Sequence, residues 1–344
     1  MKRVFRFRNL IWILIPLLVW WSLRNIDLYQ VWNTIRSLQL YKILILIALN
    51  AVIVLALTSR WWFVLRSFGY RISLYPLVGY RLSSFSVSYF TPGTQFGGEP
   101  LQVHFPKDRH NVPASIALAA VTVDKIFDVL TNFSFIAVGL AAFVFFGLSI
   151  DIFTGGLSSL LLIILALPLL YMLALWAGWA PLTKLISVLS RFKANHIQVN
   201  KFKGLVTSTE EVVSHQFQQQ PLLILWMFLF SALIWLLLIA EYWLSLTFLG
   251  AQLNVGQVLL ALTAARIAFL MPLPGGIGAL EASQIWAMQT LGFDPVLGVS
   301  LVLIIRARDI SIGILGLGLT AMLFNRQSRV NAPVHPTTPS LSGD

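Results

Sequence analysis

The chain has no cysteine among its 344 residues, and only 11% of its residues are charged. Without cysteine it cannot form disulfides, thiolate metal sites or a cysteine nucleophile. The five histidines show no metal-ligand spacing, so the sequence gives no reason to expect a metal or another cofactor. The shortage of charge excludes a soluble domain of this length, because its surface would carry too few polar groups.

Apolar residues take the place of the missing charge. Hydrophobic residues make up 58% of the chain, and its mean hydropathy is +0.81. Apolar runs of about 18 or more residues recur along it. Such runs are typical of membrane-spanning helices, whose backbone groups are hydrogen-bonded within the helix. The sequence therefore predicts an all-α polytopic membrane protein.

Basic residues outnumber acidic ones by 24 to 13, which gives a net charge of +11. In a soluble protein this excess would suggest nucleic acid. Here the bases lie mostly in short segments between apolar runs, as expected for cytoplasmic loops that face anionic lipid headgroups. We expect membrane lipids as partners and no nucleic acid.

Two glycine-rich stretches organise the chain. Each begins with Pro-Gly and reaches a glutamate seven positions after the proline. An apolar run that carries a base three residues before an aspartate follows each stretch. The prolines and the glutamates are 182 positions apart, and the bases and the aspartates are 181 apart, so we infer a diverged internal repeat with one indel. The first copy contains Pro92, Gly93, Gly97, Gly98, Glu99, Lys125 and Asp128, and the second contains Pro274, Gly275, Gly276, Gly278, Glu281, Arg306 and Asp309.

The apolar runs and the basic loops together predict the topology. The basic N-terminus precedes an apolar run without a small-residue cleavage site, which favours an uncleaved first span over a secretory signal. If 76–90 crossed the membrane fully, many later bases would lie outside the cell. We therefore expect re-entrant hairpins near 76–110 and 255–291, both termini in the cytoplasm and a cytoplasmic connector over 179–220. Residues 1–330 form one domain on this interpretation, 331–344 form a disordered tail, and the six full spans are 10–23, 41–58, 112–150, 158–176, 221–249 and 296–324.

The two hairpins enter from opposite faces in this topology, so the repeat is an inverted one. Inverted repeats, broken helices and charges at mid-depth are typical of secondary transporters. Non-helical backbone at this depth must be buried or line an aqueous cavity, so the glycine-rich turns predict a cavity. Helix N-termini beyond the turns offer N–H groups to an anion such as a lipid phosphate. The alternative is that the turns are only tight bends.

Charges inside apolar segments are candidates for function. Lys125 with Asp128, and the equivalent Arg306 with Asp309, lie one helical turn apart and can pair on one helix face. Such pairs bind substrate or only neutralise each other for insertion, and both interpretations stay open.

Six further positions add to this set. Glu99 and Glu281 bind a cationic headgroup, carry a proton, or meet the bases Lys125 and Arg306 across the cavity. Arg266, which has no charged counterpart in the first copy, is a candidate for binding phosphate. Asp124 and Arg308 add charge beside each pair, and we expect Glu241 to be interfacial.

These residues resemble the lysylphosphatidylglycerol synthase transmembrane family, also called the flippase-like domain family. Residues 272–281, PLPGGIGALE, resemble its P-x-P-G-G-x-G-x-x-E signature. Residues 91–99 resemble its earlier P-G-x-x-x-G-E element, with an additional residue before the glutamate. Asp124 and Lys125 stand where the family's E-R-x-x-D helix has Glu-Arg. The resemblance implies a membrane domain that moves aminoacylated phosphatidylglycerol between leaflets in bifunctional members, whose soluble aminoacyl-transfer domain this chain lacks.

The sequence thus predicts a lipid translocase of a bacterial or archaeal plasma (inner) membrane. We expect it to carry the headgroup of an anionic or aminoacylated phospholipid, or of a lipid-linked sugar, between leaflets. One alternative is a membrane-embedded transferase in lipid aminoacylation or glycolipid synthesis, although no nucleotide or metal motif accompanies the acids. Another is a non-catalytic partner of such an enzyme. The sequence leaves homo-oligomerisation open.

Overall fold

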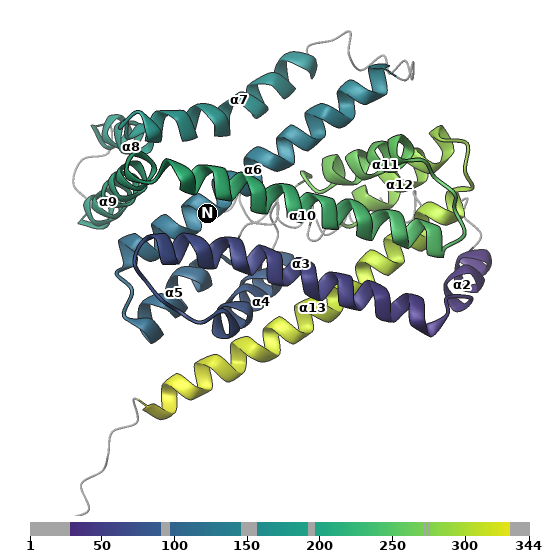
Figure 1. Cartoon of the computed structure of the whole chain (residues 1–344), viewed down its shortest axis with the longest axis horizontal. Helices are drawn as coiled ribbons and strands as arrows, with labels where there is room; N and C mark the ends of the chain where they lie inside the picture. The colour runs from purple at the N-terminus through teal and green to yellow at the C-terminus, as the bar shows by residue number, and fades with distance from the viewer. Residues whose placement is uncertain are drawn as a thin grey trace, which may run out of the picture.

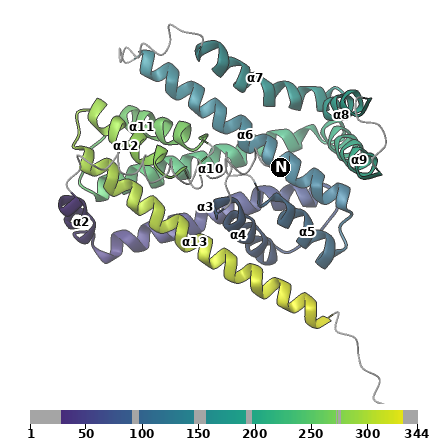
Figure 2. The same ribbon diagram turned by 180° about the vertical axis from the view of Figure 1, so that it is seen from behind.

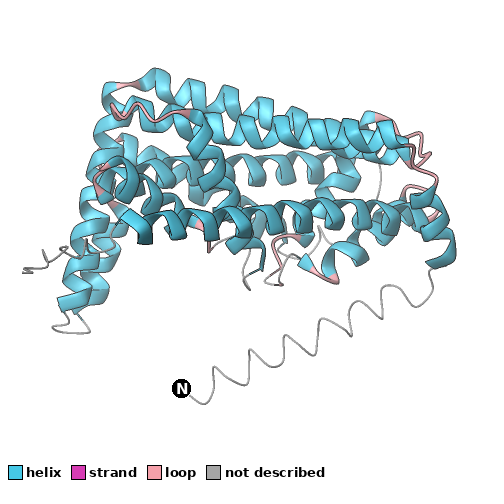
Figure 3. Ribbon diagram, turned by 90° about the horizontal axis from the view of Figure 1, so that it is seen from below, coloured by secondary structure: helices cyan, strands magenta, loops and turns pink. Residues whose placement is uncertain are grey.

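The computed structural model of the chain describes residues 28–90, 97–145, 157–191, 197–271, 273 and 276–330. This described part consists of helices alone, as predicted, and contains no strand (Figure 3). The predicted first span at 10–23 and the tail at 331–344 lie outside it. The helices are α2 Leu28–Arg36, α3 Leu40–Ser67, α4 Leu74–Phe90, α5 Glu99–His110, α6 Ala114–Phe145, α7 Leu157–Trp176, α8 Pro181–Arg191, α9 Ile197–Gln219, α10 Pro221–Phe248, α11 Val255–Ala268, α12 Ala279–Thr290 and α13 Pro295–Val330.

Two of the described helices, α3 and α10, are long and apolar enough to cross a membrane. Only 6% and 22% of their most apolar windows are buried, so apolar side chains cover their outer faces, as lipid requires. Residues 166–176 of α7 and 181–188 of α8 meet at a bend of 101° and count as a third span only if taken together. These helices fit a polytopic membrane protein. Six full spans and two re-entrant hairpins stay a prediction.

The helix bounds repeat along the chain with the offset found in the sequence. Helices α3 and α10 both begin and end 181 positions apart, and so do the starts of α4 and α11 and of α6 and α13. The starts of α5 and α12 differ by 180. We call α3–α6 the first half and α10–α13 the second half. Helices α3 and α10 lie side by side and run in opposite directions (Figures 1 and 2).

The two halves interlock through equivalent helices. Helix α4 of the first half packs on α13 of the second, and α11 of the second packs on α6 of the first. Gly316 allows the first of these contacts, because a Cβ there would lie 2.2 Å from the carbonyl oxygen of Leu82. Each half also has a core of its own, with Trp61 and Phe105 fully buried in the first and Leu246 and Leu280 in the second.

Candidate functional site

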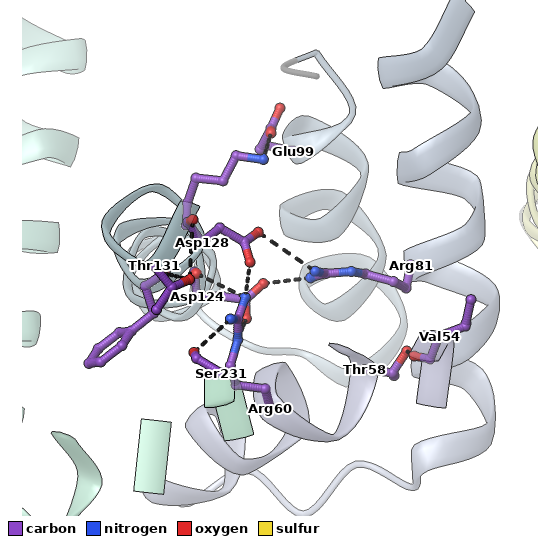
Figure 4. A network of polar contacts seen from close by, with 11 residues as sticks. Val54, Thr58, Arg60, Arg81, Glu99, Asp124, Asp128, Thr131 and Ser231 are labelled. Atoms are coloured by element: carbon purple, nitrogen blue, oxygen red, sulfur yellow. Dashed lines mark hydrogen bonds and ion pairs between the residues drawn. The ribbon is translucent and has the colours of Figure 1, made fainter. Parts of the chain in front are cut away.

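An ion network in the first half joins α3, α4 and α6. Arg60 on α3 donates from Nε to Asp124 Oδ1 at 2.7 Å and from Nη2 to Asp128, both on α6. Arg81 on α4 donates to Asp124 Oδ2 at 2.5 Å, and its Nη2 lies 3.9 Å from Asp128 Oδ2. Figure 4 shows the two arginines converging on the two aspartates. Because the Arg60 and Asp124 side chains are 1% and 3% exposed, they depend on each other and not on water for stabilisation.

The second half carries a different ion network, between α10 and α13. Arg308 on α13 donates to Glu241 of α10, and its Nε donates to Asp309 Oδ1 at 2.8 Å. Asn50 of α3 donates from Nδ2 to Glu241 Oε1 at 3.0 Å. The Glu241 side chain is only 10% exposed, because Arg308 of α13 and Asn50 of α3 cover it, and its expected place at the membrane interface stays a prediction. Its position near the outer end of an apolar run gave no sign that α13 would cover it.

Each network extends across the contact between α3 and α10 onto the spanning helix of the other half. Arg60 on α3 donates from Nη1 to Ser231 Oγ of α10 at 3.0 Å, while Asn50 on α3 donates to Glu241 of α10. Arg60 and Glu241 are 181 positions apart, and so are Asn50 and Ser231. The same two positions of each half thus form the contact, as in a two-fold related interface.

Beside these networks, each half pairs the glutamate that follows its glycine-rich stretch with the base of its longest helix. In the first half, Lys125 Nζ lies 2.9 Å from Glu99 Oε1. In the second, Arg306 donates to Glu281 Oε1 from Nη2 at 3.1 Å and from Nε at 3.3 Å. Of the three roles left open for the glutamates, a contact with these bases is therefore the arrangement in the structure. We call the two contacts the glutamate–base pairs.

Glycine places both glutamates at a helix start. The backbone N–H of Gly97 donates to Glu99 Oε2 at 2.7 Å, and that of Gly278 donates to Glu281 Oε2 at 2.7 Å. The φ angles of Gly97 and Gly278 are +135° and +83°, values that favour glycine over residues with a Cβ. Each carboxylate thus caps its own helix with Oε2 and binds a base with Oε1, and Oε2 of Glu281 also accepts from Arg306 Nη2 at 3.4 Å.

Arg266, at the last turn of α11, is a half-buried base of a different kind. Its guanidinium lies 4.8 Å from the ring centroid of Trp235, a cation–π contact, and its buried Nε has no hydrogen-bond partner. Among the described residues, none forms an ion pair with it. A guanidinium whose buried Nε–H is unpaired is suited to binding an anion.

A family model for the lysylphosphatidylglycerol synthase TM region matches residues 11–316. The chain belongs to this family. It is 23% identical to a UPF0104 membrane protein of Pyrococcus horikoshii, with 93% of this chain and 96% of the relative covered. It is 21% identical to a UPF0104 membrane protein of Methanothermobacter thermautotrophicus, over 77% of this chain and 80% of that protein. No solved structure matches the chain.

Within each half, the structure brings together most of the charged residues that the sequence and the family resemblance singled out. Gly97, Gly98, Gly276 and Gly278 lie at the described ends of the glycine-rich stretches, next to the charged side chains. Pro92, Gly93, Pro274 and Gly275 lie outside the described residues. The role of this set in binding substrate stays a prediction.

The pairing inside each long helix is not the one proposed from the spacing. Asp128 contacts Arg60 and Arg81, and Asp309 contacts Arg308, while Lys125 and Arg306 meet glutamates of neighbouring helices. Arg60 and Arg81 follow the predicted span 41–58, where bases are typical of a cytoplasmic loop, so the sequence analysis did not single them out for the ion network. The available signal was that Arg60 and Glu241, 181 positions apart, are both charges within apolar surroundings.

Within the described residues, no group of three or more His, Cys, Asp or Glu side chains is placed to hold a metal. Two shallow hollows, of about 520 and 260 Å³, lie beside α9 and are lined by its Glu211 and His215. Neither is lined by the ion networks. The glycine-rich turns lie partly outside the described residues, so the cavity predicted there stays a prediction.

Proposed function

We propose that this protein is a lipid translocase that moves a phospholipid or lipid-linked headgroup between the leaflets of the plasma (inner) membrane. The observation that carries the proposal is the repeated glutamate–base pair, Glu99 with Lys125 and Glu281 with Arg306, at the two glycine-rich stretches. Two polar sites related by a repeat, inside an apolar helical domain, are what alternating access to two leaflets requires. The family's description as a lysylphosphatidylglycerol synthase TM region supports a lipid as substrate.

An ion pair is a suitable receptor for a headgroup that carries both signs of charge. Moving a headgroup through the apolar layer is costly because its charges lose water. A phosphate that takes the place of Glu281 at Arg306, while the glutamate accepts a cationic or hydroxyl group of the headgroup, keeps every charge paired. This partner exchange favours phospholipids with an aminoacyl or other hydrogen-bond-donating headgroup over a bare phosphate.

Arg266 adds an anion site to this scheme. Its buried Nε lacks a partner, and its helix ends just before the second glycine-rich stretch. We assign it to the lipid phosphate. The first half has no charged residue at the matching place, so the second half binds the phosphate more strongly in this proposal.

The topology proposed for transport follows the opposite directions of α3 and α10. If both cross the membrane, the halves have opposite orientations and form an inverted repeat, with the glycine-rich stretches entering from opposite faces as re-entrant hairpins. The acyl chains then stay in lipid beside α4, α6, α11 and α13 while the headgroup passes the glutamate–base pairs. Six full spans and cytoplasmic termini complete this topology.

The direct test is lipid translocation in proteoliposomes. Purified protein is reconstituted with fluorescent phosphatidylglycerol, lysyl-phosphatidylglycerol or a neutral lipid, and an impermeant reductant bleaches only the outer leaflet. We expect bleaching beyond the outer-leaflet fraction for the anionic and aminoacylated lipids. Bleaching no greater than in empty vesicles for all lipids contradicts the proposal, and a covalently changed lipid in the mass spectrum favours a transferase instead.

A further inference from the structure

Helix α8 leaves an apolar face without a protein partner. Leu182, Leu185 and Val188 recur at helical spacing along one side and are 42%, 54% and 48% exposed. The opposite, polar side packs on α9, where Thr183 Oγ1 donates to Thr207 Oγ1 at 3.2 Å. An apolar stripe that points away from the protein, on a helix whose polar side is the packed side, suits an apolar environment outside the protein.

This apolar face continues the outer surface of α7. Leu170, Leu173 and Trp176 are 60%, 41% and 50% exposed on the last turns of α7, and Trp179 in the link is 63% exposed. In a polytopic membrane protein, an exposed leucine-rich helix faces lipid. The chain then turns by 101° into α8, so that α8 runs across the end of the lipid-facing helix.

The bend between α7 and α8 is stabilised by specific hydrogen bonds and by a glycine with a positive φ angle. Gly178 takes a φ of +82°, and the N–H of Trp179 donates back to the Ala174 carbonyl at 2.8 Å, ending α7. At the start of α8, the carboxylate of Glu210 from α9 accepts hydrogen bonds from the N–H groups of Leu182 and Thr183 at 2.9 and 2.8 Å.

Glu210 also ties the bend to α7. Tyr171 of α7 donates its hydroxyl to Glu210 Oε1 at 3.2 Å, and Glu210 is only 2% exposed. A buried carboxylate at a helix N-terminus stabilises that helix through its free N–H groups and its dipole. Helix α8 is therefore fixed at its angle to α7 by one residue that contacts both.

Charge at the edge of the apolar stripe indicates which surface α8 meets. Lys184 is exposed, and its Nζ lies 5.3 Å from the centroid of the Trp179 ring. Tryptophan and lysine side by side, one at the headgroup level and one reaching to phosphates, are typical of helices at a membrane interface. The sequence adds further bases nearby, at 191, 193, 201 and 203, and no acid between 180 and 208.

We propose that α8 lies in the plane of the membrane surface, with Leu182, Leu185 and Val188 in the acyl boundary and Lys184 on the phosphates of anionic phospholipids. The occupant of the open apolar face is thus the lipid bilayer itself. This proposal is independent of lipid translocation, because it rests on the surface of α7 and α8 and not on the ion networks.

Because the chain has no cysteine, a fluorophore can be attached at a single introduced cysteine to test this placement of α8. A polarity-sensitive fluorophore is attached to L185C and, as a matched control, to E211C on the exposed surface of α9. Each protein is reconstituted in phosphatidylcholine vesicles with and without phosphatidylglycerol. Spin-labelled lipid and aqueous iodide then serve as quenchers. We expect the label at 185 to be quenched by the spin-labelled lipid and shielded from iodide, and the label at 211 to show the reverse.

A second measurement tests the contact of Lys184 with anionic lipid. One basic side chain at an anionic surface changes a partition equilibrium about fivefold. Phosphatidylglycerol should therefore deepen the label at 185, and the additional change K184Q should remove most of this effect. Equal iodide quenching at 185 and 211 overturns the proposal. Shielding from both quenchers, which indicates a protein partner or a second copy, overturns it as well, as does insensitivity to phosphatidylglycerol. V188C gives the same readout if L185C does not yield monodisperse protein.

Discussion

The first half, α3–α6, and the second half, α10–α13, both join their spanning helix to their longest helix by an ion pair, but the charges on the two spanning helices have opposite signs. At one pair of equivalent positions, the spanning helix carries a base in the first half, Arg60, and an acid in the second, Glu241. Arg60 binds two aspartates of α6, whereas Glu241 binds an arginine of α13. The feature common to both halves is an ion pair between the spanning helix and the longest helix of that half. The identities of the two charges have changed.

The glutamate–base pairs differ in a second way. Lys125 and Glu99 are 29% and 23% exposed, whereas Arg306 and Glu281 are 11% and 12% exposed. Lysine is a flexible point charge, and arginine holds a carboxylate with a rigid fork. The first half therefore has the more open and adaptable site, and the second half the more closed and more rigid one. Each of the following variants tests one side of this comparison.

The largest effect is expected for R60Q. The change leaves Asp124 buried with Arg81 as its remaining base and weakens the hold on Asp128. Removing one partner of a buried ion network costs about 3–5 kcal/mol of stability. Thermal unfolding in detergent, followed by tryptophan fluorescence, measures the loss. R66Q on the exposed side of the same helix is the control and should cost no more than about 1 kcal/mol, since it loses only the cation–π contact with Trp62.

A smaller effect is expected for E241Q in the second half. Arg308 keeps Asp309 as a partner, and a glutamine still accepts a hydrogen bond from Asn50, so about 1–3 kcal/mol is lost. The same unfolding experiment compares the two halves directly. Equal losses of stability for E241Q and R60Q would contradict the expectation that the second network depends less on the charge of its spanning helix.

These differences also show which features of the fold and of the site can be predicted from the sequence. The internal repeat, the all-helical class and the involvement of Glu99 and Glu281 follow from residue types and spacing. The partners of Arg60 do not, because a base after an apolar run is also the mark of a cytoplasmic loop, and only the fold shows that α3 continues to Ser67 beneath Asp124. The pairing of Lys125 with Glu99 was one of three roles left open for that glutamate, and the sequence could not select it because Asp128 is the nearer acid.

The structure of the connector, including helix α8, is another feature that the sequence does not predict. Residues 179–220 were expected to lie at the surface as one polar segment, and they form two helices. The sharp turn between α7 and α8 depends on Glu210, which comes from α9 about thirty positions later. Local composition carries no information on such a contact.

The smallest effect is expected for exchange of the two bases. R306K keeps the charge but loses the two-donor contact with Glu281, and the loss of one hydrogen bond to a charged group lowers the translocation rate about tenfold. K125R should stay within a factor of about three, since arginine keeps the positive charge and can still donate to Glu99 at this more exposed site. Initial rates of lipid bleaching in proteoliposomes measure both. Greater sensitivity of the first site would reverse the assignment of the open and rigid halves.

The most direct measurement of the central claim is lipid translocation by the double variant E99Q/E281Q. This protein keeps the fold-defining networks of Arg60 and Arg308 but loses both carboxylates at the glycine-rich stretches. Wild type and E211Q, which changes an exposed glutamate on α9, serve as references after each protein has been shown to be monodisperse. We predict that E211Q transports fluorescent phosphatidylglycerol like the wild type and that the double variant falls to the level of empty vesicles. Translocation by E99Q/E281Q at the wild-type rate would contradict the account.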